Sequence, residues 1–121
     1  MNLDRIDHIQ LAMPEGAEER ARAFYRDTLG LPEVDKPANL ADRGGAWFGI
    51  DAVKVHLGVD PNFVAAKKAH PAFIVRDLGT LIEKCERGGY QVVDDEPLVG
   101  FSRVYVFDPF GNRLEFLEPA P

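Results

Sequence analysis

The sequence predicts an α+β fold built from two βαβββ modules, and two observations lead to this prediction. The order of elements, which is one strand, one helix and three strands, begins again after residue 69. Side chains that can bind a metal also recur at matched places. His8 and His70 open the two halves, and His56 and Glu115 lie in their closing strands. The members of each pair are about 60 residues apart, and such an array is too short to be a solenoid.

Length and composition indicate one soluble domain. The 121 residues are expected to form a single domain over 1–121, with modules at 1–60 and 70–121. Hydrophobic residues make up 45% and charged residues 28% of the chain, which is typical of globular proteins. The net charge of -6 argues against nucleic acid or an anionic membrane as a partner. The N-terminus lacks the apolar core of a signal peptide and no run approaches membrane-spanning length, so a cytoplasmic protein is expected.

The first module begins with alternating apolar residues, which predict a strand. A helical spacing of apolar residues follows and stops at Gly30, a residue typical of the end of a helix. Three extended runs complete the module, and glycine or aspartate residues separate them. We therefore predict a strand at 6–13, a helix at 17–29, and strands at 38–42, 46–50 and 53–59.

A polar loop at 60–69 precedes the second module. An amphipathic pattern there predicts a helix that stops at Gly88 and Gly89. Cys85 lies in this helix and, as the single cysteine of the sequence, cannot form an intrachain disulfide. The predicted elements are a strand at 70–76, the helix at 78–87, and strands at 90–94, 103–108 and 112–117.

The last two predicted strands are joined by Asp-Pro-Phe-Gly-Asn (108–112), which is typical of a hairpin turn. In the strand that follows, Leu114 and Phe116 point to one side and Glu115 points to the other. Glu115 is thus a carboxylate with apolar neighbours in the chain. A charge in a half-buried sheet requires a partner or a function.

The three histidines of the chain and Glu115 form a candidate metal site. Each module supplies one residue from its first strand and one from its last, on the face opposite the one expected to pack on a helix. If the modules close into one curved sheet, these side chains converge. Three imidazoles and a carboxylate suit Zn, Ni, Co, Mn or Fe(II), and an octahedral ion would keep two positions open. Without His56, the remaining set is the two-histidine, one-carboxylate arrangement of oxygen-activating Fe(II) sites.

A structural interpretation of the same residues is also open. A single histidine on a strand is usually a surface residue or a hydrogen-bonded core residue, and Glu115 could be an exposed strand residue. His56 depends most on the register, because a shift of one residue would turn its side chain to the other face.

Four segments of the sequence together resemble the vicinal oxygen chelate superfamily. They are Asp-His-Ile at 7–9, Phe-Tyr-Arg-Asp-Thr-Leu-Gly-Leu at 24–31, His-Pro-Ala-Phe-Ile-Val at 70–75 and Asp-Pro-Phe-Gly-Asn-Arg-Leu-Glu-Phe at 108–116. This superfamily includes glyoxalase I, fosfomycin-resistance thiol transferases, extradiol dioxygenases, methylmalonyl-CoA epimerase and bleomycin-binding proteins. The segments span nearly the whole chain, but they do not select one reaction.

The resemblance implies an open, cup-shaped mixed β-sheet barrel around a divalent metal, with the helices outside. His8, His70 and Glu115 match the first, third and fourth ligand positions of the family. His56 stands where glyoxalase I usually has glutamate. A site with one carboxylate and a divalent ion is formally +1, which would favour an anionic or enolising substrate.

The resemblance implies a metal-dependent, glyoxalase-like lyase or isomerase that stabilises an enediolate or oxyanion on a small oxygen-chelating substrate. Glu115 is the candidate catalytic residue, which could act as a base if it leaves the metal. The alternatives are an extradiol-type dioxygenase, a fosfomycin-type thiol transferase, and a metal-free protein that binds a drug or metabolite, as bleomycin-resistance proteins do. A homodimer is expected, and segment 94–102 could act as a lid. The candidate substrate-binding residues are Gln10, Lys54, Arg113, Trp47 and Tyr105.

Overall fold

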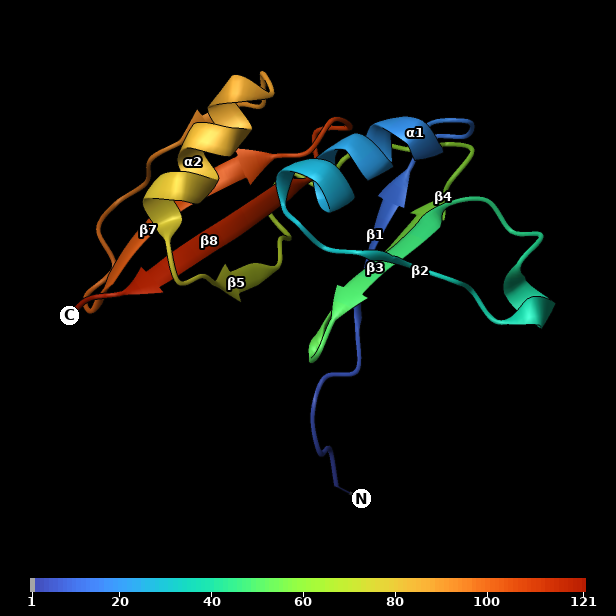
Figure 1. The fold of residues 1–121 in the computed structure, drawn as a ribbon, viewed down its shortest axis with the longest axis horizontal. Helices are drawn as coiled ribbons and strands as arrows, with labels where there is room; N and C mark the ends of the chain where they lie inside the picture. The colour runs from blue at the N-terminus through green and yellow to red at the C-terminus, as the bar shows by residue number, and fades with distance from the viewer. Residues whose placement is uncertain (1) are drawn as a thin grey trace. The chain divides into compact units, whose positions relative to one another are not determined.

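The structure is a computed structural model, and it describes residues 2–121. The chain divides into two compact units, Met1–Phe63 and Val64–Pro121. Each unit contains one open, four-stranded mixed sheet with helical segments (Figure 1). The predicted α+β class and the repeat of the modules are confirmed, while the single domain over 1–121 stays a prediction.

The first unit has four strands in the spatial order β1-β4-β3-β2. Strand β1 runs parallel to β4, and the other neighbours are antiparallel. Because β1 and β4 are parallel, the chain must cross from one to the other, and the intervening helix and hairpin provide this connection. The elements are β1 (Ile9–Met13), α1 (Glu18–Ala21), η1 (Arg22–Thr28), β2 (Glu33–Val34), η2 (Ala38–Leu40), β3 (Ala46–Ile50) and β4 (Val53–Val59).

The predicted helix at 17–29 is present, but its second half is wider than an α-helix. From Arg22 the chain forms a π-type helix, and the amide of Leu29 donates to the carbonyl of Phe24 five residues earlier. The wider turn places the adjacent side chains Phe24 and Tyr25 both fully inside the core. The ring of Tyr25 stacks on Phe48 of β3 with 5.6 Å between centroids, which fixes the helix on the sheet.

The extended run predicted at 38–42 is wrong. Residues Ala38–Leu40 form a turn of 3-10 helix that begins after Pro37, and the amide of Leu40 donates to the Pro37 carbonyl. Pro37 precedes the turn with an extended ψ of 150°, and the segment after it has no β-branched residue that would favour a strand. The short strand Glu33–Val34, which pairs with β3, was not predicted.

The second unit repeats the same arrangement, with its strands in the order β5-β8-β7-β6. Strand β5 is parallel to β8, and the remaining pairs are antiparallel. The predicted strands at 70–76 and 90–94 shorten to three and two residues. The elements are β5 (Ala72–Ile74), α2 (Leu78–Arg87), β6 (Val92–Val93), β7 (Phe101–Phe107) and β8 (Arg113–Pro119).

Helix α2 has the predicted bounds. The carboxylate of Asp77 accepts from the amide of Thr80 and so caps the N-terminus, and Gly89 follows the helix with φ +82°. The helix packs against β6, β7 and β8, as Figure 1 shows for β7 and β8. Cys85 is a free thiol on its buried side, and burial raises the pKa of this thiol to about 11.

The turn between β7 and β8 is the predicted hairpin turn. The carboxylate of Asp108 accepts from the amides of Phe110 and Asn112 and from the Asn112 side chain, and Gly111 adopts φ +90°. These bonds fix the register of β7 on β8. Leu114 and Phe116 are buried on one face and Glu115 points to the other, as the alternation predicts.

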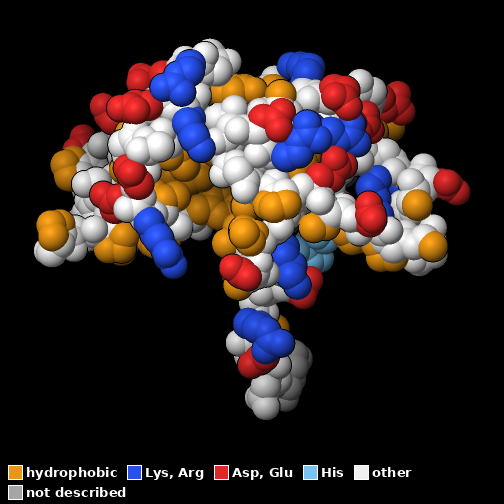
Figure 2. Space-filling model, in the orientation of Figure 1, with side chains coloured by type: hydrophobic (Ala, Val, Ile, Leu, Met, Phe, Trp, Pro, Cys, Tyr) orange, Lys and Arg blue, Asp and Glu red, His pale blue; other side chains and the backbone are white. Residues whose placement is uncertain are grey.

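On the face shown in Figure 2, acidic and basic side chains are interspersed over the helices. Among residues 2–121, no helix has both the length and the apolar character that crossing a lipid bilayer requires.

Candidate functional site

The two sheets place His56 and Glu115 at the same position of the repeat. In the first unit His56 of β4 lies between Gln10 of β1 and Trp47 of β3. In the second unit Glu115 of β8 lies between Ala72 of β5 and Tyr105 of β7. Residues opposite one another across strands share a face of the sheet. Each candidate ligand of a closing strand thus has an aromatic residue beside it on the third strand of its unit.

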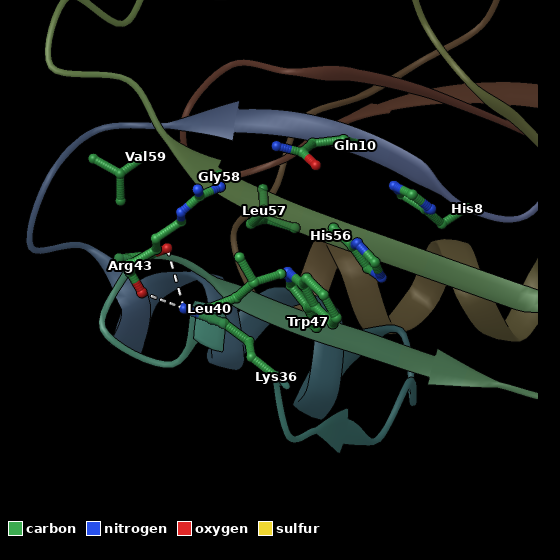
Figure 3. Close-up of a pocket in the computed structure, with 11 residues that line it drawn as sticks. His8, Gln10, Lys36, Leu40, Arg43, Trp47, His56, Leu57, Gly58 and Val59 are labelled. Carbon is green, nitrogen blue, oxygen red and sulfur yellow. Dashed lines mark hydrogen bonds between the residues drawn. The ribbon is translucent and has the colours of Figure 1, made fainter. Parts of the chain in front are cut away.

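The first unit brings His8 and His56 together in a stack of three rings (Figure 3). The ring centroids of His8 and His56 are 4.1 Å apart, and those of His56 and Trp47 are 3.8 Å apart with only 3° between the planes. The backbone of His8 lies just before β1, and the side chain is 38% exposed. The stack positions both imidazoles without a hydrogen bond between them.

The surroundings of His8 and His56 favour ring forms in which one nitrogen has a lone pair that can bind a metal. The Nδ1 atom of His8 lies 3.0 Å from a carboxylate oxygen of Asp7. A carboxylate can only accept, so Nδ1 carries the proton and Nε2 keeps its lone pair in the neutral ring. For His56, burial and then the neighbouring His8 lower the pKa, so the ring stays neutral to lower pH than an exposed histidine.

The second unit brings His70 and Glu115 into direct contact. The Nε2 atom of His70 lies 2.9 Å from Glu115 Oε1, and its Nδ1 lies 2.8 Å from the carbonyl oxygen of Lys68. His70 precedes β5 rather than lying in it, because the strand begins only after Pro71. Since the Lys68 carbonyl takes the Nδ1 proton, the contact with Glu115 needs a second proton on Nε2. A cation bound by both atoms would replace that proton.

Glu115 has a second partner that the sequence did not suggest. Arg103 Nη1 donates to Glu115 Oε2 at 3.1 Å and to the hydroxyl of Tyr105, also at 3.1 Å. Burial opposes ionisation of the carboxyl, but the bonds from His70 and Arg103 outweigh it and hold the pKa of Glu115 below its usual value. The hairpin register could have revealed Arg103, since it lies on β7 two residues before Tyr105, the partner of Glu115.

The other candidates for substrate binding fall into two groups. Gln10 and Trp47 line a cavity next to His56. The Nζ atom of Lys54 lies 3.7 Å from Asp7, and Lys54 borders a second hollow of about 420 Å³ that Trp47 and His56 also border. In the second unit the Arg113 guanidinium lies 3.8 Å from the centre of the Tyr105 ring. Its Nε is buried and lacks a hydrogen-bond partner within the described part of the chain.

The cavity beside His56 belongs to the first unit and measures about 570 Å³ (Figure 3). His8, His56 and Trp47 form one side of it, and Lys36, Leu40 and Arg43 approach from the segment before β3. This volume suits a small organic molecule, since such sites commonly measure about 300–1,000 Å³.

Comparisons with known proteins identify the family of the chain. The sequence model of the Glyoxalase/Bleomycin resistance protein/Dioxygenase superfamily matches residues 5–116. The chain belongs to this superfamily. No curated protein matches the sequence. Among solved structures, the chain is similar to a glyoxalase family protein from Bacillus anthracis, with 45% identity, a TM-score of 0.93, and 99% of this chain and 98% of that one covered.

More distant relatives share the fold alone. A glyoxalase/dioxygenase from Nostoc punctiforme is 21% identical with a TM-score of 0.81. The fosfomycin resistance protein FosX from Listeria monocytogenes is 14% identical with a TM-score of 0.76. Each of these matches covers 99% of this chain and 94% of the other. The superfamily includes proteins with different chemistries, so the function of this chain must be argued from the side chains of its own site.

In this superfamily member the predicted ligands form two pairs, His8 with His56 and His70 with Glu115. Across residues 2–121, no set of three or more His, Cys, Asp or Glu residues is arranged to hold a metal ion. The first pair nevertheless offers two nitrogen ligands and the second a nitrogen and an oxygen, which are atoms that zinc, nickel, cobalt, manganese or ferrous iron accept. The metal site, its identity and the role of Glu115 stay predictions.

Proposed function

We propose that the chain is a divalent-metal-dependent, glyoxalase-like enzyme of the lyase or isomerase type, acting on a small substrate with neighbouring oxygen atoms. The supporting observation is the His70–Glu115 pair. Its nitrogen and oxygen lie 2.9 Å apart, while the other ring nitrogen of His70 is held by the Lys68 carbonyl. This second hydrogen bond is the usual way in which a protein orients a histidine toward a metal.

The ligand set that we propose consists of His8, His56, His70 and Glu115. His8 resembles His70 in having its Nδ1 tied to an oxygen, here that of Asp7, which leaves Nε2 available. The lowered pKa of His56 favours its neutral, metal-binding form. A bound divalent ion would supply positive charge against negative charge that develops on the substrate oxygens.

The residues around Glu115 would control its role as a base. Arg103 holds Oε2 of Glu115, and Oε1, which lies 2.9 Å from His70 Nε2, is the oxygen that we expect to bind the metal. Glu115 would take a proton from the substrate once Oε1 leaves the metal. The low pKa of Glu115 keeps it ionised and able to accept that proton. In the first unit Gln10 would donate a hydrogen bond to the substrate. In the second unit Arg113 would bind an anionic group of the substrate.

Metal content tests the proposal. The purified chain, dialysed in turn against Zn, Ni, Co, Mn or Fe(II), is expected to retain one ion per chain in elemental analysis. His8→Ala and Glu115→Gln should each lower the metal affinity at least about tenfold, because each removes a ligand. Glu83→Gln, which removes an exposed carboxylate from α2, is the matched control and should bind metal as the wild type does.

Equal and negligible metal in the wild type and in His8→Ala would contradict the proposal. That result would support the metal-free alternative, a protein that binds a drug or metabolite. One observation favours this alternative: His70 and Arg103 each provide a hydrogen-bond partner for one carboxylate oxygen of Glu115 without an ion. Oxygen uptake with a catechol under Fe(II) would instead indicate a dioxygenase, and thiol-dependent loss of an epoxide antibiotic would indicate a thiol transferase.

We further propose that the chain forms a homodimer in the cytoplasm. Each unit gathers only two of the four ligand candidates around itself, so a second copy is a possible source of the others. Light scattering during gel filtration should give twice the mass of the 13.5 kDa chain, and the mass of a single chain would count against the dimer. Cell fractionation would test the location.

A further inference from the structure

The cavity of the first unit is positively charged, although the protein as a whole is negative. The chain has 20 acidic and 14 basic residues. The side chains around the cavity nevertheless include Lys36 and Arg43 and no aspartate or glutamate. Glu18, Glu33 and Asp35 border an adjoining hollow that shares Lys36, Arg43 and Trp47 with the cavity. The cavity itself is therefore lined by cations and not by carboxylates.

Arg43 is the cation that is available to a ligand. Within the part of the chain that the structure describes, no carboxylate lies within 4 Å of its guanidinium, whereas the first-unit arginines Arg22 and Arg26 are ion-paired. In Figure 3 the side chain extends from the loop before β3 toward Gly58 of β4. Five donors in a planar fork suit a carboxylate or phosphoryl group, which can accept two parallel hydrogen bonds.

Lys36 has mainly a structural role in the same wall. Its ammonium donates to the carbonyl oxygens of Arg43 and Gly44, and so closes the loop that carries Arg43. The amide of Arg43 also donates to the Leu40 carbonyl at 3.1 Å. These bonds fix the backbone of Arg43, so its guanidinium is presented from an ordered loop.

The opposite wall adds a further donor. The Gln10 side chain covers Gly58, and a Cβ atom on that glycine would lie 2.6 Å from Gln10 Nε2. The absence of a side chain at Gly58 thus leaves room for the amide group. Trp47 and Leu40 supply apolar surface to the same cavity. Hydrogen-bond donors and cations gathered beside an apolar wall are complementary to an organic anion.

We propose that this cavity binds the carboxylate or phosphoryl end of a small organic anion, with Arg43 as the residue that selects for negative charge. The inference rests on the function proposed above, because His8 and His56 border the same cavity and the anion would be the substrate that they meet. It names the class of substrate: a small molecule with an anionic group at one end and neighbouring oxygens at the other.

Trp47 provides a direct test, since it is the single tryptophan of the chain and borders the cavity. Succinate, inorganic phosphate and the uncharged succinamide are titrated at constant ionic strength while tryptophan emission is recorded. Both anions should change the emission saturably, and succinamide should not. Arg43→Gln should weaken anion binding at least about tenfold, the usual loss when a charged hydrogen-bond partner is removed.

Two variants serve as controls for this titration. Arg43→Lys keeps the charge and should retain part of the affinity, which separates loss of the cation from a disturbed loop. Arg87→Gln removes an exposed charge from the other unit and should bind as the wild type does. Unchanged anion affinity in Arg43→Gln, or succinamide binding as tight as succinate binding, would overturn the inference.

Repeating the titration with EDTA-treated and zinc-loaded protein separates this inference from the proposed function. Anion binding that depends on Arg43 in the EDTA-treated protein supports the cavity site even when metal binding fails. One zinc ion per chain, together with anion affinity that does not change in Arg43→Gln, overturns the anion site and leaves the metal enzyme standing.

Discussion

The two units have the same strand order and register, yet they hold their candidate ligands in different ways. In the first unit His56 is stacked between the rings of His8 and Trp47, beside an open cavity. In the second unit Glu115 is bonded to His70 and Arg103. The repeated backbone thus sets the position of each candidate metal-binding residue, while the neighbouring side chains determine whether it is already hydrogen-bonded. Metal binding would require no exchange of partners in the first unit, but would replace the His70–Glu115 contact in the second.

The largest expected effect comes from the buried residues that precede these two ligands. Leu114 precedes Glu115 and Val55 precedes His56, and both are fully buried. Leu114→Ala should lower the free energy of unfolding by about 2–5 kcal/mol, and Val55→Ala by about 1–3 kcal/mol because it removes less apolar volume. Urea unfolding followed by circular dichroism measures both. A larger loss in Val55→Ala would show that the first unit, and not the second, has the less adaptable core.

An intermediate effect on the free energy of unfolding should appear only at alkaline pH, and it should come from Cys85 in the second unit. Burial raises the pKa of the Cys85 thiol from 9.0 to about 11, so between these values the folded chain keeps a proton that the unfolded chain has lost. Stability should therefore fall as the pH rises through this window, by at most about 2–3 kcal/mol. Urea unfolding at pH 8 and pH 10.5 measures the fall. Cys85→Ala should lose this part of the pH dependence, and an unchanged profile in that variant would assign it to other groups.

The smallest effect concerns the charge on Glu115. Removing the guanidinium in Arg103→Met should raise the pKa of the Glu115 carboxyl in the metal-free protein, because one of the two bonds that favour its ionised form is lost. A carboxyl whose pKa is lower in the folded chain than in the unfolded chain stabilises the fold at pH values above the unfolded-chain pKa, and this stabilisation is lost as the pH falls. In Arg103→Met the free energy of unfolding should therefore fall less on acidification. Carbon NMR of the carboxyl records the titration. Arg113→Met, which removes the cation stacked on Tyr105, is the control and should shift the pKa less.

The sequence predicted the repeated elements well where local signals were strong. Gly88 and Gly89 marked the end of the second helix, and the turn at 108–112 indicated the last hairpin and the side to which Glu115 points. The 3-10 turn at Ala38–Leu40 was missed because a three-residue segment has no clear period. The π-type half of the first helix depends on packing Phe24 and Tyr25 together, which periodicity does not express.

For the site, pairing across strands could be predicted and partners from other segments could not. The alternation of apolar residues correctly placed His56 and Glu115 on the face opposite their buried neighbours in the strand. Arg103 was overlooked, although the hairpin register places it two residues before the strand partner of Glu115. Arg43 was missed because its importance follows from the cavity that it faces, and not from its neighbours in the chain. Lys54 lies 3.7 Å from Asp7 and borders a hollow together with His56 and Trp47, and its role in substrate binding stays a prediction.

All the strand pairs between residues 2 and 121 lie within one half of the chain or the other. A single cut in the connecting segment after Phe63 would therefore leave every interstrand ladder whole. The two fragments could be made separately and mixed, or their order in the gene exchanged, without removing a strand from either sheet.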